Sequence, residues 1–152
     1  MFKYKSSPIV IIILFIFLAI FLFIFFKISK KELQENERLM KNNIVFEGVV
    51  TNTKVSGNHA FGIIELKLSK SSVAEFNKKI NDGIYPYKIK GNIAEIYCVV
   101  SIERKKGDII KVISNEETVY YNFEKSKEVG DIYIVTDSNN IEFVKKNTIF
   151  KY

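Results

Sequence analysis

Residues 9–26 have the sequence IVIIILFIFLAIFLFIFF, eighteen consecutive positions without a polar side chain. As an α-helix with a rise of about 1.5 Å per residue, this segment is about 27 Å long, close to the hydrocarbon thickness of a bilayer. The sequence therefore predicts a transmembrane anchor over residues 9–28, preceded by a tail of residues 1–8.

The residues that follow indicate whether this segment is cleaved. The stretch from Phe25 to Lys31, FFKISKK, offers no small-residue site for cleavage, and the apolar run is longer than that of a cleaved signal peptide. We therefore expect an uncleaved signal-anchor and a single-pass membrane protein that contacts the membrane through Ile9 to Phe26.

Charges on the two sides of the anchor bear on its orientation. Two lysines precede the apolar run, and five Lys or Arg residues follow it between positions 27 and 41. Counted literally, these charges place the following domain in the cytoplasm. A short basic N-region before a long apolar run is, however, the plan of a secretory signal, and long domains translocate largely regardless of charge. We expect the domain to be extracytoplasmic, with the cytoplasm as the alternative.

The net charge of +6 raises the question of nucleic-acid binding. Residues 1–43 hold seven Lys or Arg against three acidic residues, and residues 44–152 hold sixteen against fourteen. Most of the excess is therefore next to the membrane, where basic residues interact with anionic headgroups. A protein that follows a phosphate backbone needs a clustered basic face, so we expect no nucleic-acid partner.

Residues 29–43 are polar and free of Gly and Pro, which predicts a helical stalk. From Ile44 the pattern changes to a period of two in β-branched residues, which indicates a β-rich soluble domain over residues 44–152. One short helix is expected over residues 72–83, where Ser72 and Glu75 form a capping box and Val73, Phe76 and Ile80 share a face. Strands are expected at residues 44–53, 60–68, 85–90, 93–102, 109–113, 118–123, 132–136 and 141–144. The fold class is mainly β: a transmembrane helix followed by a small antiparallel β-barrel or sandwich.

Few residues of the sequence are of a type and spacing suited to catalysis or metal binding. Cys98 lies in an apolar run, and the lone His59 lies in a Gly/Asn turn without ligands at metal spacing. We expect no catalytic residue, no metal and no cofactor; a non-enzymatic domain is the first expectation, and an enzyme stays open as the alternative. Tyr85, Tyr87 and Lys88 interleave aromatic and basic groups and are the candidate binding residues, although such aromatics also serve simply to cover a core.

Two resemblances bear on function. The stretch from Val99 to Asp108, VVSIERKKGD, resembles the region of type I signal peptidases that carries their general-base lysine. The matching position here is Val100, and no Ser-x-Met-x-Pro segment follows the anchor, so the similarity is topological. The chain also resembles small uncharacterised bacterial membrane-anchored β-domain proteins, through the FEGVV strand at Phe46–Val50 and the KKGDIIK turn at Lys105–Lys111. This second resemblance implies an architecture and no activity.

These observations lead to three hypotheses. The first is a membrane-tethered, non-enzymatic binding or structural domain of the bacterial envelope. The second is a degenerate or unconventional envelope hydrolase related to the anchored signal peptidases, with Lys105, Lys106 and Asp108 as its residues. The third is a small subunit of a larger membrane complex, with a protein partner in the membrane or envelope.

Overall fold

The computed structural model of the chain describes residues 8–100 and 104–150. The chain divides into two compact units, Met1–Asn36 and Glu37–Tyr152.

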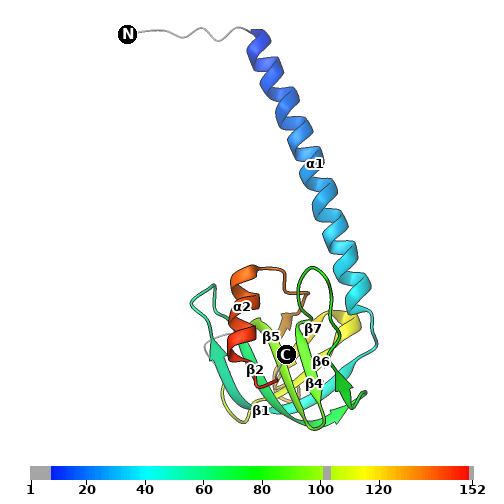
Figure 1. Cartoon of the computed structure of the whole chain (residues 1–152), viewed down its shortest axis with the longest axis vertical. Helices are drawn as coiled ribbons and strands as arrows, with labels where there is room; N and C mark the ends of the chain where they lie inside the picture. The colour runs from blue at the N-terminus through cyan, green and yellow to red at the C-terminus, as the bar shows by residue number, and fades with distance from the viewer. Residues whose placement is uncertain (1–7, 101–103, 151–152) are drawn as a thin grey trace. The chain divides into compact units, whose positions relative to one another are not determined.

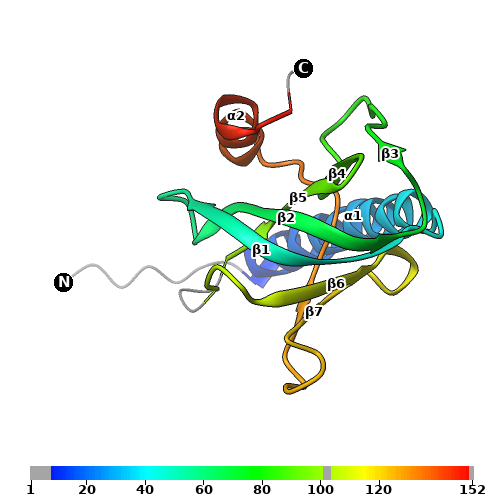
Figure 2. The same cartoon turned by 90° about the horizontal axis from the view of Figure 1, so that it is seen from below.

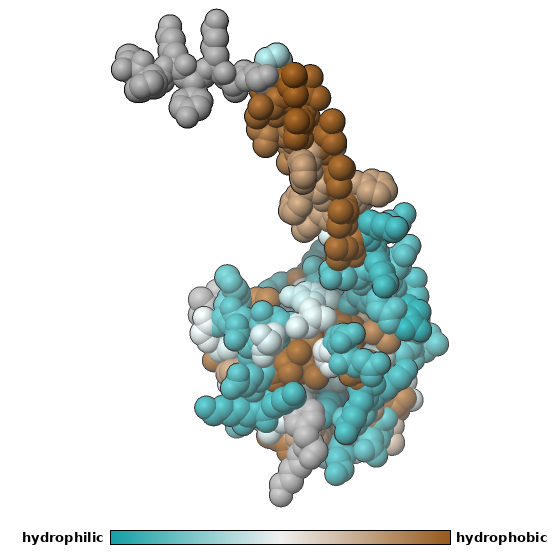
Figure 3. Space-filling model, turned by 45° about the horizontal axis from the view of Figure 1, so that its top comes forward, coloured by the Kyte–Doolittle hydropathy of each residue, from teal (hydrophilic) through white to brown (hydrophobic). Residues whose placement is uncertain are grey.

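The first unit consists of most of the helix α1, Pro8–Met40. Proline suits the first helical position because its missing N–H has no intrahelical acceptor there. Every large apolar side chain between Ile9 and Phe26 is exposed, from 43% at Ile11 to 76% at Phe26, and an 18-residue window has a mean hydropathy of 3.7. A helix that is apolar on all sides is stable only in apolar surroundings. This helix is long and apolar enough to cross a membrane (Figure 3).

The second unit is built on one antiparallel sheet (Figure 1), which has eight strands within the described residues. The strands lie in the order β3-β4-β5-β2-β1-β6-β7-β8. Their bounds are β1 Val45–Val55, β2 Phe61–Ser71, β3 Glu75–Phe76, β4 Tyr87–Lys90, β5 Ile93–Val99, β6 Ile109–Ile113, β7 Thr118–Tyr121 and β8 Val129–Asp131. A 3₁₀ turn, η1 Ser114–Glu116, and a second helix, α2 Ser138–Asn147, complete the unit.

Strands β1 and β2 form the long central hairpin of this sheet. Their register shifts between Glu47 and Gly48 and again between Val50 and Asn52, as β-bulges do. At the first shift a Cβ on Gly48 would lie 2.7 Å from the carbonyl oxygen of Lys67, so only glycine fits. Bulges bend a strand and increase its twist, which lets the sheet curl around the main hydrophobic core.

The sheet has an inner and an outer face, and β5 shows both. Ala94, Ile96 and Cys98 belong to the main core, which contains buried residues from both flanks of the sheet. Tyr97 points the other way, into a smaller cluster with Val144 of α2. In Figure 2, strands β2 and β5 lie in the middle of the unit. Helix α2 is on one side of them, and strands β6 and β7 are on the other side. We call the face under α2 the outer face.

The curled sheet is not a closed barrel, so the expectation of a barrel is wrong. Its edge strands β3 and β8 have only two and three residues, too few for a continuous ladder between them. The flanks are joined instead by one isolated bridge, in which the Ile84 N–H donates to the Val135 carbonyl (3.0 Å) and the Val135 N–H to that of Ile84 (2.9 Å).

The short helix lies elsewhere than predicted. Residues 72–83 contain β3 and a bridge at Lys79 in place of a helix, and the Ser72 hydroxyl accepts from the Val45 N–H (3.0 Å) in place of capping. The short helix of the structure is α2, and it includes residues 141–144, which were expected to form a strand. It begins after Asp137, whose side chain accepts from the Asn140 N–H (2.9 Å).

One other expected strand is almost lost in the structure, and another ends earlier than expected. The strand expected at residues 132–136 is reduced to the bridge at Val135. The strand expected over residues 93–102 ends at Val99, and residues 101–103 lie outside the described part.

Candidate binding groove

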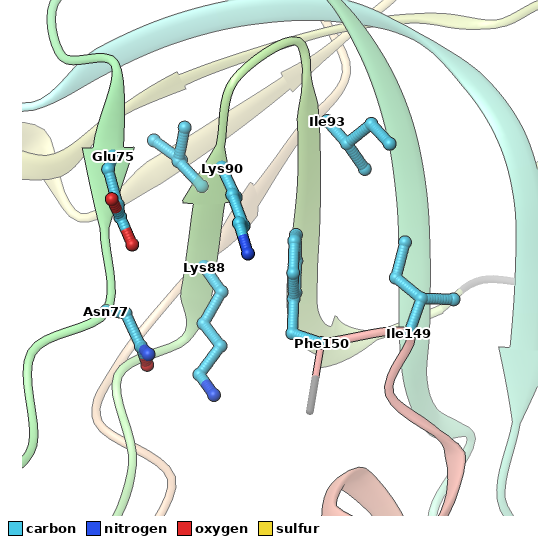
Figure 4. Close-up of a pocket in the computed structure, with 8 residues that line it drawn as sticks. Glu75, Asn77, Lys88, Lys90, Ile93, Ile149 and Phe150 are labelled. Atoms are coloured by element: carbon cyan, nitrogen blue, oxygen red, sulfur yellow. The ribbon is translucent and has the colours of Figure 1, made fainter. Parts of the chain in front are cut away.

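Two adjoining clefts lie on the outer face, beside β4. The first, of about 610 Å³, is lined by Glu75, Asn77, Lys88, Lys90, Ile149 and Phe150, among others (Figure 4). The second, of about 450 Å³, lies between the loop after β3 and α2. Because Asn77 and Lys88 line both clefts, we treat the two as one feature, the outer-face groove.

A buried carboxylate holds one wall of this groove. Glu95 of β5 is fully buried. It accepts from the Tyr97 hydroxyl (2.8 Å), from the Ile149 N–H (2.9 Å) and from the Thr148 hydroxyl. A buried carboxylate is costly unless it is hydrogen-bonded, so these donors fix the position of the segment that carries Thr148 and Ile149. The wall is therefore fixed by contacts within the chain itself.

Lys88 lies directly opposite Glu95 across the β4–β5 ladder. Burial lowers the pKa of Lys88, and the negative charge of Glu95 acts in the opposite direction. The ammonium of Lys79 lowers the Lys88 pKa further, since like charges repel. Lys79 and Lys88 are thus close enough in the groove to repel each other, and Glu95 lies opposite Lys88 on the neighbouring strand.

Helix α2 forms another wall and is attached at both ends. At its C-terminal end, the Lys54 ammonium donates to the Asn147 carbonyl (2.7 Å) and pairs with Glu65 (2.7 Å). At its N-terminal end, the Asn58 amide donates to the Asn140 side chain (2.9 Å). A cation near the last carbonyls of a helix is favourable for its dipole.

The charged side chains that line the groove are mostly positive. The second cleft is lined by the four lysines Lys78, Lys79, Lys88 and Lys145, with no carboxylate among its lining residues in the part of the chain described. With Lys90 and Glu75 of the first cleft, the groove has five lysines and one acid. The remaining residues of 44–152 then contain eleven basic against thirteen acidic residues. The positive charge of the domain is therefore concentrated here.

The three predicted binding residues all line the second cleft. Tyr85 and Tyr87 are nonetheless only 3% and 0% exposed, and both belong to the main core. The Asn42 amide donates to the Tyr87 hydroxyl (2.8 Å), and the Tyr85 hydroxyl donates to the Leu39 carbonyl (3.3 Å). Burial raises the pKa of Tyr87 to about 12. Lys88 is the member of the trio on the outer face, and a binding role for the trio remains a prediction.

Sequence reasoning missed the lysines contributed by other segments. Lys78 and Lys79 come from the segment expected to be helical, and Lys145 lies just beyond the strand expected at residues 141–144. The sequence feature that could have indicated this basic site is the pair Lys78-Lys79, which lies between Asn77 and Asn81.

The residues of the other hypotheses lie apart from the groove. Lys105 and Lys106 are exposed, and Asp108 accepts from the Lys105 N–H (2.9 Å), as in a turn. Cys98 is buried, and burial raises its pKa to about 11. His59 is exposed at a positive φ of 48°. Over residues 8–100 and 104–150, no group of His, Cys, Asp and Glu is arranged to hold a metal ion.

No protein-family model matches this chain, and neither a curated protein nor a solved structure matches it.

Proposed function

We propose that this chain is a membrane-tethered, non-enzymatic binding domain of the bacterial envelope, and that the outer-face groove is its binding site. The observation that carries the proposal is the fixed wall of the groove, where three donors converge on the buried Glu95. Binding sites are usually clefts that exist before the ligand arrives, because a rigid site loses little conformational entropy on binding.

The anchor supports the tethered part of the proposal. A helix with a mean hydropathy of 3.7 over 18 residues and exposed apolar side chains is suited to a bilayer. We propose that it is an uncleaved signal-anchor and that the domain lies outside the cytoplasm. A dual-reporter fusion after Tyr152 tests the side: an enzyme active only outside the cytoplasm should be active, and a fluorescent protein that matures only inside should stay dark. The reverse result contradicts the orientation.

Site-specific photo-crosslinking in intact cells tests the groove. A photoreactive phenylalanine at Ile149, which lines the first cleft and is 46% exposed, should give a discrete adduct with a protein, glycan or lipid. The matched control is Val129 of β8, which is 54% exposed and lies outside the groove. Adducts of equal yield from both positions, or none from Ile149, would contradict the proposal.

A further inference from the structure

The outer-face groove carries a more specific inference, which rests on the proposed function. Lys78, Lys79 and Lys145 reach the second cleft from two separate segments, the loop after β3 and α2. None of the three forms an ion pair within the described residues. Their charges therefore lie at a cleft whose lining, in the described part of the chain, includes no carboxylate.

The basic groups of the groove are all ammonium groups, with no arginine among the described lining residues. Arginine is favoured where carboxylate or phosphate is bound through two parallel hydrogen bonds, whereas lysine acts as a point charge and is a common phosphate ligand, so the choice between the two anions rests on their charge. A carboxylate brings one negative charge, while a phosphate monoester brings about 1.5 to 2 at neutral pH and three acceptor oxygens. Several ammonium groups around one cleft are therefore better matched by a phosphate monoester than by a carboxylate.

Two amide side chains, Asn77 and Asn81, also line the second cleft and can donate hydrogen bonds to phosphate oxygens. At about 450 Å³ the cleft has room for more than one phosphate group, within the usual range for small-ligand sites. We propose that the second cleft of the groove binds a phosphate-bearing ligand through Lys78, Lys79 and Lys145. The phosphate belongs either to a soluble ester or to a lipid headgroup.

The test uses the full chain in nanodiscs of zwitterionic lipid, titrated with inorganic pyrophosphate and, for comparison, citrate. Pyrophosphate should bind more tightly than citrate, and its Kd should rise with salt because the contacts are partly exposed. A parallel arm measures binding to zwitterionic vesicles containing phosphatidic acid. Binding in the first arm alone assigns a soluble ester, and binding in the vesicle arm alone assigns a headgroup.

Two matched pairs of variants separate the cleft from general charge. Lys145→Gln should weaken binding about threefold, while Lys146→Gln, the exposed neighbour that does not line the cleft, should change it less than about twofold. The double variant Lys78→Gln/Lys79→Gln should weaken it about tenfold, against little change for Lys125→Gln/Lys127→Gln, which removes the same charge from an exposed loop.

Three results would overturn the inference: no binding in either arm, citrate binding as tight as pyrophosphate, or equal losses within each matched pair. If Ile149 still gives a crosslinked adduct in cells, only the phosphate is excluded and the groove stands as a binding site. If neither experiment gives a signal, the proposed function fails with it.

Discussion

The two faces of β5 differ in what they bury, although they come from alternate residues of one strand. The inner face buries Ala94, Ile96 and Cys98 in a continuous apolar core. The outer face buries Glu95 with three hydrogen-bond donors around it and Lys88 opposite. Apolar burial holds a sheet together without directional partners, whereas a buried carboxylate is tolerated only in a specific arrangement. The inner face therefore supplies stability, and the outer face supplies a defined surface.

Two residues on opposite faces of β5, Ile96 and Val99, give the largest test of this difference. Ile96→Ala removes a fully buried side chain from the inner core and should lower the free energy of unfolding by about 3 kcal/mol. Urea unfolding of the full chain in detergent measures the loss. Val99→Ala, at a position 52% exposed, is the control and should stay within about 0.5 kcal/mol. A similar loss for both would remove the inner face as the main source of stability.

Glu95→Gln tests the outer face with a smaller expected effect. Glutamine keeps the size of the side chain but turns one acceptor into a donor that faces donors, which should lower the free energy of unfolding by about 1.5 kcal/mol. The Ile149 amide should lose protection from hydrogen exchange, because it donates to the Glu95 carboxylate. Unchanged protection at Ile149 would show that Glu95 does not hold this wall.

A third variant addresses the α2 wall. Lys54→Met removes both the bond to the Asn147 carbonyl and the pair with Glu65, and should cost about 0.5 to 1 kcal/mol, since both groups are partly exposed. Exchange of amides in the last turn of α2 should speed up. Lys67→Met, at an exposed position of the same hairpin, should leave that turn unchanged.

The smallest expected effect concerns a charge at the rim of the inner core. The Arg104 guanidinium lies 3.4 Å from the centre of the Tyr121 ring and pairs with the exposed Glu128, and the hydrogen bond from Arg104 lowers the Glu128 pKa below its ordinary 4.5. The pair therefore stabilises the fold above about pH 4.5, and this contribution is lost as the pH falls through the lowered pKa. NMR titration should show that pKa returning toward 4.5 in Arg104→Gln. An unchanged Glu128 pKa in that variant would rule out Arg104 as the cause.

The predictable parts of this molecule were those set by composition and local alternation. The apolar run of residues 9–26 and the alternating β1 and β2 sequences needed no tertiary information. The helix predicted at residues 72–83 failed because Phe76 packs against the rings of Tyr85 and Tyr87, at 4.9 and 5.2 Å, in a strand geometry. A helix this short has little stability of its own to oppose such packing.

The helix α2 was missed for a different reason. Residues 137–140 lie between the strands expected at 132–136 and 141–144, a position that favours a turn, yet Asp137 is equally suited to cap a helix, and it does so. Residues 138–147 are too short a segment for periodicity alone to separate a helix from a strand. The site was less predictable than the fold, because its lysines converge from β4, the loop after β3 and α2, and this convergence depends on long-range pairing.

The bonds between Glu95 and residues 148 and 149 also set an order of assembly. Fifty-four positions separate Glu95 from Ile149 along the chain, so at about 5 to 20 residues per second a ribosome adds the second residue about 3 to 11 seconds after the first. Until then the carboxylate has no partner on that wall, although both strands of the β1–β2 hairpin are already made. A nascent or clipped chain that stops short of residue 148 would have its inner core residues and no finished groove. Ligand binding would thus report that synthesis had passed this point.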